Sequence, residues 1–292
     1  DYKSHRKAIE RNYTSNSLLL KSKSIISPFG ELSSINVAAI KIPKSIEEFE
    51  FYLQKAQQDL DENGVVICGF MTKYFTKQWL EIAATYFEDI EQSKAKKKAR
   101  LLILKNKKNV EHQYVTNKIE YKDKVYEQYA GVFSSNHIDF ATQFFLDHLT
   151  IKETEVNILD LASGNGVIAD QIQLNNSNVK LSLIDDSFLA IESSKKNLSR
   201  EATFVWNDNL ETFDDEVFDL VVSNPPFHFE YENNSEVALG LFEQVHRCLK
   251  ESGRFTLVAN QHLNYKTHLD KQFTSCSVVA ENDKFVVYEC IK

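Results

Sequence analysis

The chain has 292 residues, of which 42% are hydrophobic and 12% aromatic, and this is enough apolar material for two domain cores. Its formal net charge is −8, no apolar run approaches the ~18 residues of a membrane span, and no signal-peptide pattern opens the chain, which favours an intracellular, cytoplasmic protein. The four cysteines are scattered without paired spacing, so we expect reduced core thiols and neither a disulfide framework nor a metal site.

The charge is divided unevenly along the chain. Residues 1–128 contain 22 Lys and Arg against 17 Asp and Glu, a net +5, and residues 129–292 carry −13. The basic half is therefore expected to face RNA, because cationic side chains neutralise phosphates. A solvated turn is the competing interpretation of its densest basic run, which contains Lys96, Lys97, Lys98 and Arg100.

The first half predicts alternating strands and helices. Ser45 followed by Glu48 forms a capping-box pattern at the start of a helix, after a strand at residues 37–44. Residues 65–70 then predict a strand, residues 76–90 a helix and residues 100–104 a strand. Residues 110–131 predict a β-hairpin, with segments 114–116 and 119–121 on either side of a polar turn.

Polar and glycine residues follow three successive strands of the second half. A buried strand at residues 156–161 runs into a turn with Gly164 and Gly166, where the backbone can approach a ligand closely. A second strand ends in Asp185, at the spacing at which a carboxylate meets the ribose hydroxyls of a nucleoside. A third strand leads to Asp208, which can accept a hydrogen bond from an adenine amine. The pattern indicates a nucleoside cofactor.

The fourth strand, residues 218–223, ends in Asn224-Pro225-Pro226-Phe227. The Asn224 side-chain oxygen and the Pro225 carbonyl can each accept one N–H of a planar amine, and Phe227 can stack on the ring that carries it. Such an arrangement holds a weakly nucleophilic amine in position for methylation. The competing interpretation is a strand followed by a Pro-Pro stop and a turn.

These motifs together resemble the S-adenosylmethionine-dependent methyltransferases, and specifically the ribosomal RNA guanine-N2 methyltransferases. His228 after the Asn-Pro-Pro-Phe motif narrows the resemblance to that family. The segments 258–265 and 282–288 resemble the branch that modifies large-subunit (23S) rRNA, and segment 132–134 with the helix near Asp139 resembles the part that closes over the cofactor. The likeness extends over roughly residues 110–292.

The resemblance implies two tandem Rossmann-like class I methyltransferase domains of α/β type. It implies S-adenosylmethionine as cofactor, rRNA as partner, no metal, and a monomeric enzyme. Ala162 stands where the family has Gly, and an alanine there requires a negative φ. The expected catalytic residues are Asn224, Pro225 and Phe227. The residues expected to bind the cofactor are Asp160, Gly164, Asn165, Gly166, Asp185 and Asp208. The residues expected to bind the substrate are His228, Lys96, Lys97, Lys98 and Arg100.

The first half repeats the order of elements of the second and is interpreted as its degenerate, incomplete copy. Ile42 is assigned to the position of Asn224, and an isoleucine can accept no N–H from an amine. Only six residues separate Gly30 from Val37, so two or three βα units are missing there. We therefore expect an RNA-binding domain at residues 1–109 and a catalytic domain at residues 110–292.

Two alternatives remain open from the sequence. One is a methyltransferase for another planar amine, such as adenine N6 or a glutamine amide. The other is a non-catalytic RNA-binding assembly factor that retains the fold.

Overall fold

The computed structural model describes residues 2–15, 28–30, 34–111, 114, 116–134, 136–225, 232–263 and 265–292. Two compact units are present: a larger one formed by Asp1–Ser22, Lys118–Gln128 and Val132–Lys292, and a smaller one formed by Lys23–Asn117 and Tyr129–Gly131. The N-terminal helix α1 (Lys3–Ser15) thus belongs to the larger unit. No helix of the described residues is long and apolar enough to cross a membrane.

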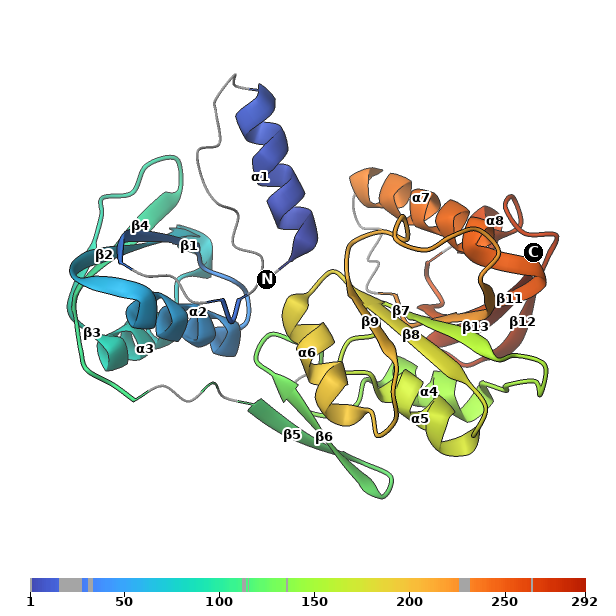
Figure 1. The fold of residues 1–292 in the computed structure, drawn as a ribbon. Helices are drawn as coiled ribbons and strands as arrows, with labels where there is room; N and C mark the ends of the chain where they lie inside the picture. The colour runs from blue at the N-terminus through green and yellow to red at the C-terminus, as the bar shows by residue number, and fades with distance from the viewer. Residues whose placement is uncertain are drawn as a thin grey trace. The chain divides into compact units, whose positions relative to one another are not determined.

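A seven-stranded sheet forms the centre of the larger unit, in the order β12-β13-β11-β10-β7-β8-β9 (Figure 1). The five strands β9, β8, β7, β10 and β11 run parallel, and β13 and β12 are antiparallel additions. The strand bounds are β7 Asn157–Leu161, β8 Lys180–Asp185, β9 Thr203–Trp206, β10 Phe218–Ser223, β11 Leu249–Asn260, β12 Ser275–Glu281 and β13 Phe285–Ile291. The strands expected in the second half are confirmed.

Helices cover both faces of this sheet, as the alternation of buried side chains requires (Figure 1). On β7, Ile158 packs with the helices α4 and α5, whereas Leu159 and Leu161 pack into the cluster of α7 and α8. A hairpin of β5 and β6 adds Ile119 and Tyr126 to the first of these clusters. The bounds are α4 Phe140–His148, α5 Val167–Asn175, α6 Phe188–Asn197, α7 Glu232–Cys248, α8 Tyr265–Leu269, β5 Thr116–Tyr121 and β6 Lys124–Tyr129.

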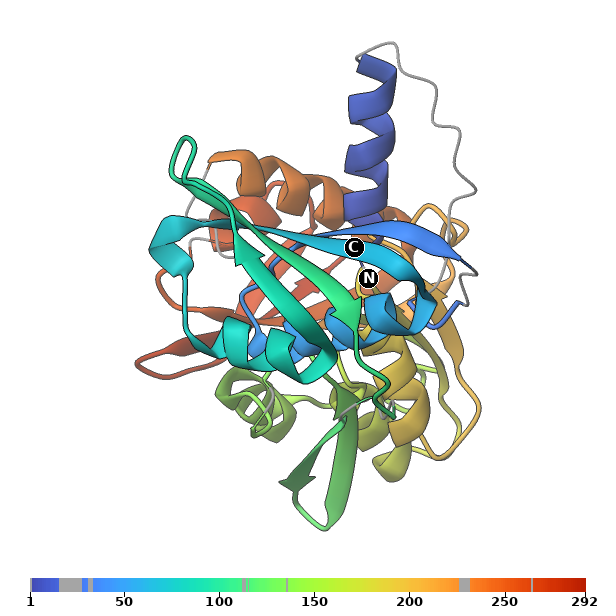
Figure 2. The ribbon, with the colours of Figure 1, turned by 90° about the vertical axis from the view of Figure 1, so that its left-hand side faces the viewer.

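The smaller unit has a four-stranded sheet in the order β1-β2-β4-β3 (Figure 2). Its helices α2 and α3 share one hydrophobic core with the sheet. Side chains on the other face of the sheet stay accessible: Val37 is 56% and Leu101 40% exposed. The bounds are β1 Ile35–Lys41, α2 Ile46–Asp59, β2 Leu60–Met71, a 3₁₀ turn Thr72–Tyr74, α3 Gln78–Tyr86, β3 Phe87–Gln92 and β4 Ala99–Lys107.

The smaller unit repeats half of the larger one in residue-level detail. The order β1-β2-β4-β3, with one parallel and two antiparallel pairings, equals β10-β11-β13-β12. Both parallel pairs have the same irregularity in register: between two consecutive pairings, the first strand (β1 or β10) moves on by two residues and its partner (β2 or β11) by five. Superimposing the two irregularities aligns Leu60 with Leu249 and Gly64 with Gly253. The degenerate, incomplete copy is therefore confirmed as a fold.

This register corrects one assignment. The position of Asn224 is matched by Lys41, and Ile42 matches Pro225. The apolar run at the end of the first strand includes Ile42, so hydrophobicity alone does not fix the strand end, whereas the shared strand pairing does. Lys41 carries only N–H donors, so the first copy still has no side-chain acceptor for an amine at this position.

Other expectations in the first half hold in part. Ser45 caps α2, and its Oγ accepts the Glu48 backbone N–H at 3.1 Å, as predicted. The helix expected at residues 76–90 ends at Tyr86, because residues 87–92 pair with β4 as an edge strand. The hairpin exists, but its turn lies at Lys122 and Asp123 instead of within residues 117–118, since residues 116–121 form one strand.

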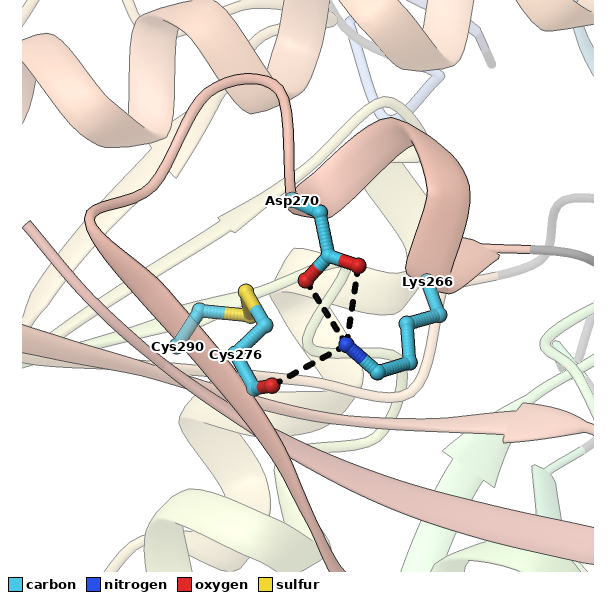
Figure 3. The surroundings of a disulfide bond; sticks show 4 residues. All are labelled: Lys266, Asp270, Cys276 and Cys290. Atoms are coloured by element: carbon cyan, nitrogen blue, oxygen red, sulfur yellow. Dashed lines mark hydrogen bonds and ion pairs between the residues drawn. A yellow bond between two sulfur atoms is a disulfide. The ribbon is translucent and has the colours of Figure 1, made fainter.

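A disulfide joins Cys276 of β12 to Cys290 of β13, contrary to the expectation of four reduced thiols (Figure 3). The two residues lie directly opposite each other in the antiparallel register of β12 and β13. They are 14 positions apart in the sequence, so no local spacing pattern indicates the pair. Next to it, Lys266 pairs with Asp270 and donates to the Cys276 carbonyl. Cys68 and Cys248 are buried free thiols, as expected.

Candidate active site

The order of the sheet changes direction between β7 and β10, which is where ligands bind in open parallel sheets. The loop with Gly164 and Gly166 follows β7, Asp185 ends the neighbouring β8, and Asn224 follows β10. Parallel strands bring these residues to one edge of the sheet. The structure thus assembles the residues that the sequence pattern singled out.

The glycine loop is tied to β8 by the Asp185 carboxylate. Its Oδ2 accepts the Gly164 backbone N–H at 2.9 Å, and its Oδ1 accepts the Ser187 N–H at 2.8 Å. Each carboxylate oxygen has a second lone pair, so Asp185 can still accept hydroxyl groups of a ribose. Gly164 has a φ of +55°, and a Cβ at this residue would meet no atom within 4 Å. The loop therefore leaves open space beside the carboxylate.

Asp160 is completely buried, and one of its carboxylate oxygens is unsatisfied. Oδ2 accepts the Ala169 N–H at 3.1 Å, whereas Oδ1 has no hydrogen-bond partner among the described residues. The pKa of Asp160 is raised to about 7, mainly by burial and to a lesser extent by the nearby Asp185 charge, against the lowering effect of the Ala169 hydrogen bond. The pKa of Asp185 is raised to about 6, because burial outweighs the lowering effect of the hydrogen bonds from the Ser187 and Gly164 N–H groups.

Asp160 is buried with an unsatisfied oxygen and Asp185 is partly buried. The two carboxylates fit a cationic ligand that carries hydroxyl groups, because such a ligand supplies both charge and donors. Asn165 and Gly166 take structural roles beside this pair. The Asn165 Oδ1 accepts the Val167 N–H, and Gly166 begins α5 with φ +80°, where a Cβ would lie 2.7 Å from the Ser194 Cβ. Only glycine fits there.

Ala162 differs from expectation. Its φ is +58°, in the left-handed region, whereas a negative φ was required for alanine to be unstrained. The conformation is set by the loop, which brings the Ser163 N–H to the Ile184 carbonyl at 3.1 Å. The loop therefore keeps the geometry of a glycine at a cost on the order of 1 kcal/mol.

Asp208 is engaged by the N-terminal helix. Lys7 Nζ lies 2.5 Å from Asp208 Oδ1, Ser4 donates from its N–H and hydroxyl to the neighbouring Asp186, and Lys3 lies over the Trp206 ring at 4.7 Å. Helix α1 thus contacts the ends of β8 and β9, which the sequence pattern did not indicate. An adenine amine that uses Asp208 has to share it with Lys7.

The Asn224 side chain is oriented by Thr142, which the sequence analysis did not select, and by Asp139, which it named only beside the segment that resembles the part closing over the cofactor. Its Nδ2 donates to Asp139 Oδ2 at 3.1 Å and to Thr142 Oγ1 at 2.8 Å. The reverse amide orientation would set a carbonyl against the Asp139 carboxylate, so the oxygen must be the free end. Asp139 also caps α4 through the N–H groups of Ala141 and Thr142. In the sequence, an aspartate directly before an apolar helix is typical of a helix N-cap, and this pattern could have indicated Asp139.

Gln128 is a further residue without a sequence signal. It is fully buried, its Nε2 donates to the carbonyl of Val132 at 3.0 Å, and its Oε1 accepts from Asn165 Nδ2 at 2.8 Å. It therefore fixes the segment before α4 to the glycine loop. Phe227 and His228 lie outside the described residues.

The basic run lies at the tip of the β3–β4 hairpin. Lys96 and Ala99 exchange both backbone hydrogen bonds, and Lys97 and Lys98 between them have φ of +49° and +64°. This is a type I′ turn, which favours Asn and Gly over Lys. The side chains of Lys96, Lys97 and Lys98 are exposed and make no ion pair with another described residue, while Arg100 donates to Gln92. No group of three or more metal-ligating side chains occurs in the described part of the chain.

Comparisons with known proteins agree with this geometry. The family model described as "Methyltransferase small domain" matches residues 124–289, and "RLMG N-terminal domain" matches residues 1–109. Ribosomal RNA large subunit methyltransferase G of Psychromonas ingrahamii is 32% identical over 271 residues, which cover 89% of this chain and 70% of that protein. The protein of the same name from Colwellia psychrerythraea is 28% identical over 278 residues, with 89% and 71% covered.

One solved structure shares the whole fold. It is the T. thermophilus 16S rRNA N2 G1207 methyltransferase in complex with AdoMet and guanosine, with a TM-score of 0.79 and 18% identity. The match covers 97% of this chain and 79% of that one. At this identity the likeness demonstrates the two-domain fold, in both units, and no more.

Proposed function

The chain belongs to the family of ribosomal RNA large subunit methyltransferase G, and from this premise we propose that it transfers the methyl group of S-adenosylmethionine to the exocyclic N2 amine of a guanine in large-subunit (23S) rRNA. The observation that carries the proposal is the Asn224 amide. Its nitrogen is committed to Asp139 and Thr142, so the side chain presents only an acceptor. With the Pro225 carbonyl it offers two acceptors for the two N–H groups of a planar amine.

The chain's own residues mainly position the reactants. S-adenosylmethionine supplies a sulfonium methyl group that is already electrophilic. Asp185 and the Gly164 backbone are assigned to the ribose, the unsatisfied Asp160 oxygen to the cationic part of the cofactor, and Asp208 to the adenine amine. Asn224 and Pro225 aim the amine lone pair, Phe227 stacks on the guanine, and His228 contacts its edge. The methylated amine is acidic enough to lose its proton to water, so a strong general base is not required.

We assign RNA binding to the domain of residues 1–109 and catalysis to residues 110–292. The support is the hairpin tip, where Lys96, Lys97 and Lys98 are exposed, form no ion pair with other described residues and occupy a turn that disfavours lysine. Strain kept at an exposed turn points to a function for the side chains there, and phosphate binding uses their charge together with Arg100. The guanine has to be unpaired or flipped to reach the site. We propose a cytoplasmic monomer.

The test is methylation of unmodified large-subunit rRNA transcribed in vitro, with S-adenosylmethionine carrying a deuterated methyl group. Digestion to nucleosides and mass spectrometry should reveal labelled N2-methylguanosine. Asn224→Ala should lower the rate by about 30- to 900-fold, because one preorganised polar group is worth roughly 2 to 4 kcal/mol in the barrier. Labelled N6-methyladenosine or labelled protein would establish a different amine as substrate. If no methyl group is transferred, the remaining interpretation is a non-catalytic RNA-binding assembly factor.

A further inference from the structure

An open groove lies beside the proposed amine site, at the carboxyl end of β11. It has a volume of about 490 Å³, which is large enough for one nucleotide. The two segments that resemble the large-subunit branch, 258–265 and 282–288, meet in it although they are far apart in the sequence. Its lining residues are Asn260, Gln261, His262, Asp283, Lys284 and Phe285.

The backbone of the groove is fixed while its side chains are available. The Gln261 N–H donates to the Lys284 carbonyl at 2.8 Å, and the Asn282 side chain accepts the N–H groups of Lys284 and Phe285, both at 2.9 Å. The side chains of Gln261, His262 and Lys284 are exposed and make no hydrogen bond or ion pair with other described residues. Rigid walls with uncommitted polar groups are suited to a ligand.

The groove continues the edge of the sheet that carries Asn224. In the parallel pairing of β10 and β11, Ser223 faces Leu257, and Asn260 is three residues further along β11. Three strand residues span about 10 Å, so the groove begins within about this distance of the proposed amine site, measured along the strand. An RNA strand whose guanine reaches Asn224 carries its neighbouring nucleotides at this range.

The smaller unit carries the proposed phosphate-binding surface on the equivalent hairpin. The Thr72 N–H donates to the Lys98 carbonyl at 2.8 Å, the equivalent of the bond between Gln261 and Lys284. Around Lys98 the hairpin tip carries further lysines and no acid, whereas Asp283 directly precedes Lys284 in the groove. An acid in the lining opposes a plain phosphate site.

The groove instead combines what a nucleobase needs. Amide groups of Gln261 and Asn260 offer donors and acceptors for a base edge, and the His262 ring offers a face for stacking. We propose that the groove holds an unpaired nucleobase adjacent to the methylated guanine, with His262 stacked on the base, Gln261 on its edge and Lys284 towards the adjoining phosphate. This inference rests on the proposed function and names a subsite for its substrate.

The test compares His262→Ala with two controls in methyl transfer to large-subunit rRNA, once the methylated guanine is mapped. Loss of one base stack should raise KM about tenfold, within the roughly 5- to 150-fold range for such stacks. His262→Phe keeps an aromatic face and should restore most of the affinity. Lys180→Ala, at the amino end of β8 on the opposite edge of the sheet, should leave KM unchanged. Cofactor affinity should be the same in all variants.

An abasic nucleotide placed on either side of the guanine in turn completes the experiment. If His262 stacks on one of these bases, removing that base should raise KM about tenfold for the wild type and hardly at all for His262→Ala. The subsite is overturned if KM is unchanged in His262→Ala. It is also overturned if the effects of His262→Ala and of the abasic nucleotide on KM multiply at both tested nucleotide positions. Methylation of the guanine persists in either case. If the wild-type protein forms no N2-methylguanosine, the proposed function itself is overturned. This result is distinguishable from failure of the subsite, in which the wild type still methylates the guanine.

Discussion

Replacing Thr142 by valine tests how strongly catalysis depends on the orientation of Asn224. The substitution keeps the shape of the side chain and exchanges the hydroxyl for a methyl group. It removes the acceptor that lies 2.8 Å from Asn224 Nδ2 and leaves the second acceptor, Asp139, in place. The cap of α4 is untouched, because Asp139 and not the Thr142 hydroxyl receives its N–H groups.

The expected loss follows from one neutral hydrogen bond, about 0.5 to 1.5 kcal/mol. If the bond serves only to hold the acceptor in place, this energy appears in the barrier, and kcat falls by about two- to tenfold. The loss should stay well below that of Asn224→Ala, which removes the acceptor itself. Affinity for S-adenosylmethionine should not change, since Asp185 and Gly164 are untouched.

The assay is single-turnover methyl transfer to rRNA, with cofactor affinity measured by calorimetry. Thr142→Ser is the matched control, because it retains the Oγ and should keep near-wild-type turnover. A Thr142→Val protein with wild-type kcat would refute the orienting role. A fall in cofactor affinity equal to the fall in rate would instead assign Thr142 to the cofactor site.

Three further predictions concern the proposed site in the larger unit, and a fourth concerns the hairpin tip of the smaller unit. Asp185→Ala should weaken S-adenosylmethionine binding by roughly 1.5 to 3 kcal/mol, the value of hydrogen bonds to a charged acceptor, and unchanged affinity in calorimetry would place the nucleoside elsewhere. Lys7→Ala should tighten cofactor binding up to about fivefold, since it releases Asp208 from a partly exposed ion pair, and an unchanged Kd would argue against Asp208 as the adenine acceptor. Because the pKa of Asp160 is raised to about 7, the folded protein binds more protons than the unfolded chain between pH 4 and 7, and its stability falls as pH rises through this window. Asp160→Asn should therefore raise Tm at pH 8 but not at pH 4. A variant that is less stable than the wild type at pH 8 would contradict a destabilising Asp160 carboxylate. Neutralising Lys96, Lys97, Lys98 and Arg100 together should weaken rRNA binding and reduce the slope of log affinity against log salt by up to about 0.9 per lost contact, whereas an unchanged slope would leave the cluster as a solvated turn.

The parallel strands of the larger unit could be predicted because each is a short apolar run that ends in a polar or glycine residue. The β7 run ends at the glycine loop and the β8 run at Asp185, so hydrophobicity and chemistry mark the same boundary. The β3 strand lacks this signal. It is an edge strand with the sequence FEDIEQ, and only its pairing with β4 distinguishes it from the last turn of a helix.

Contacts between distant residues account for what the sequence did not indicate at the site. The Asn224 amide depends on Thr142, 82 positions away, and the Lys7 contact with Asp208 spans 201 positions. Neither pair forms a local pattern. Ala162 was misjudged for a related reason: its positive φ is imposed by the loop that ties Ser163 to β8, and a propensity for negative φ is too weak to resist it.

Under the two proposals for RNA contact, the two copies of the hairpin use one backbone for two different purposes. In both, a lysine carbonyl accepts a backbone N–H from the residue that follows the long central strand, so the tip is held in the same place. The smaller unit extends this tip and fills it with lysine, whose charge suits any phosphate equally. The larger unit shortens it to Asn282, Asp283 and Lys284, and sets it beside the exposed ring of His262. We therefore expect affinity and base selection to be separable, since charge at the first tip would bind RNA of any sequence and the groups at the second tip would distinguish one base from another.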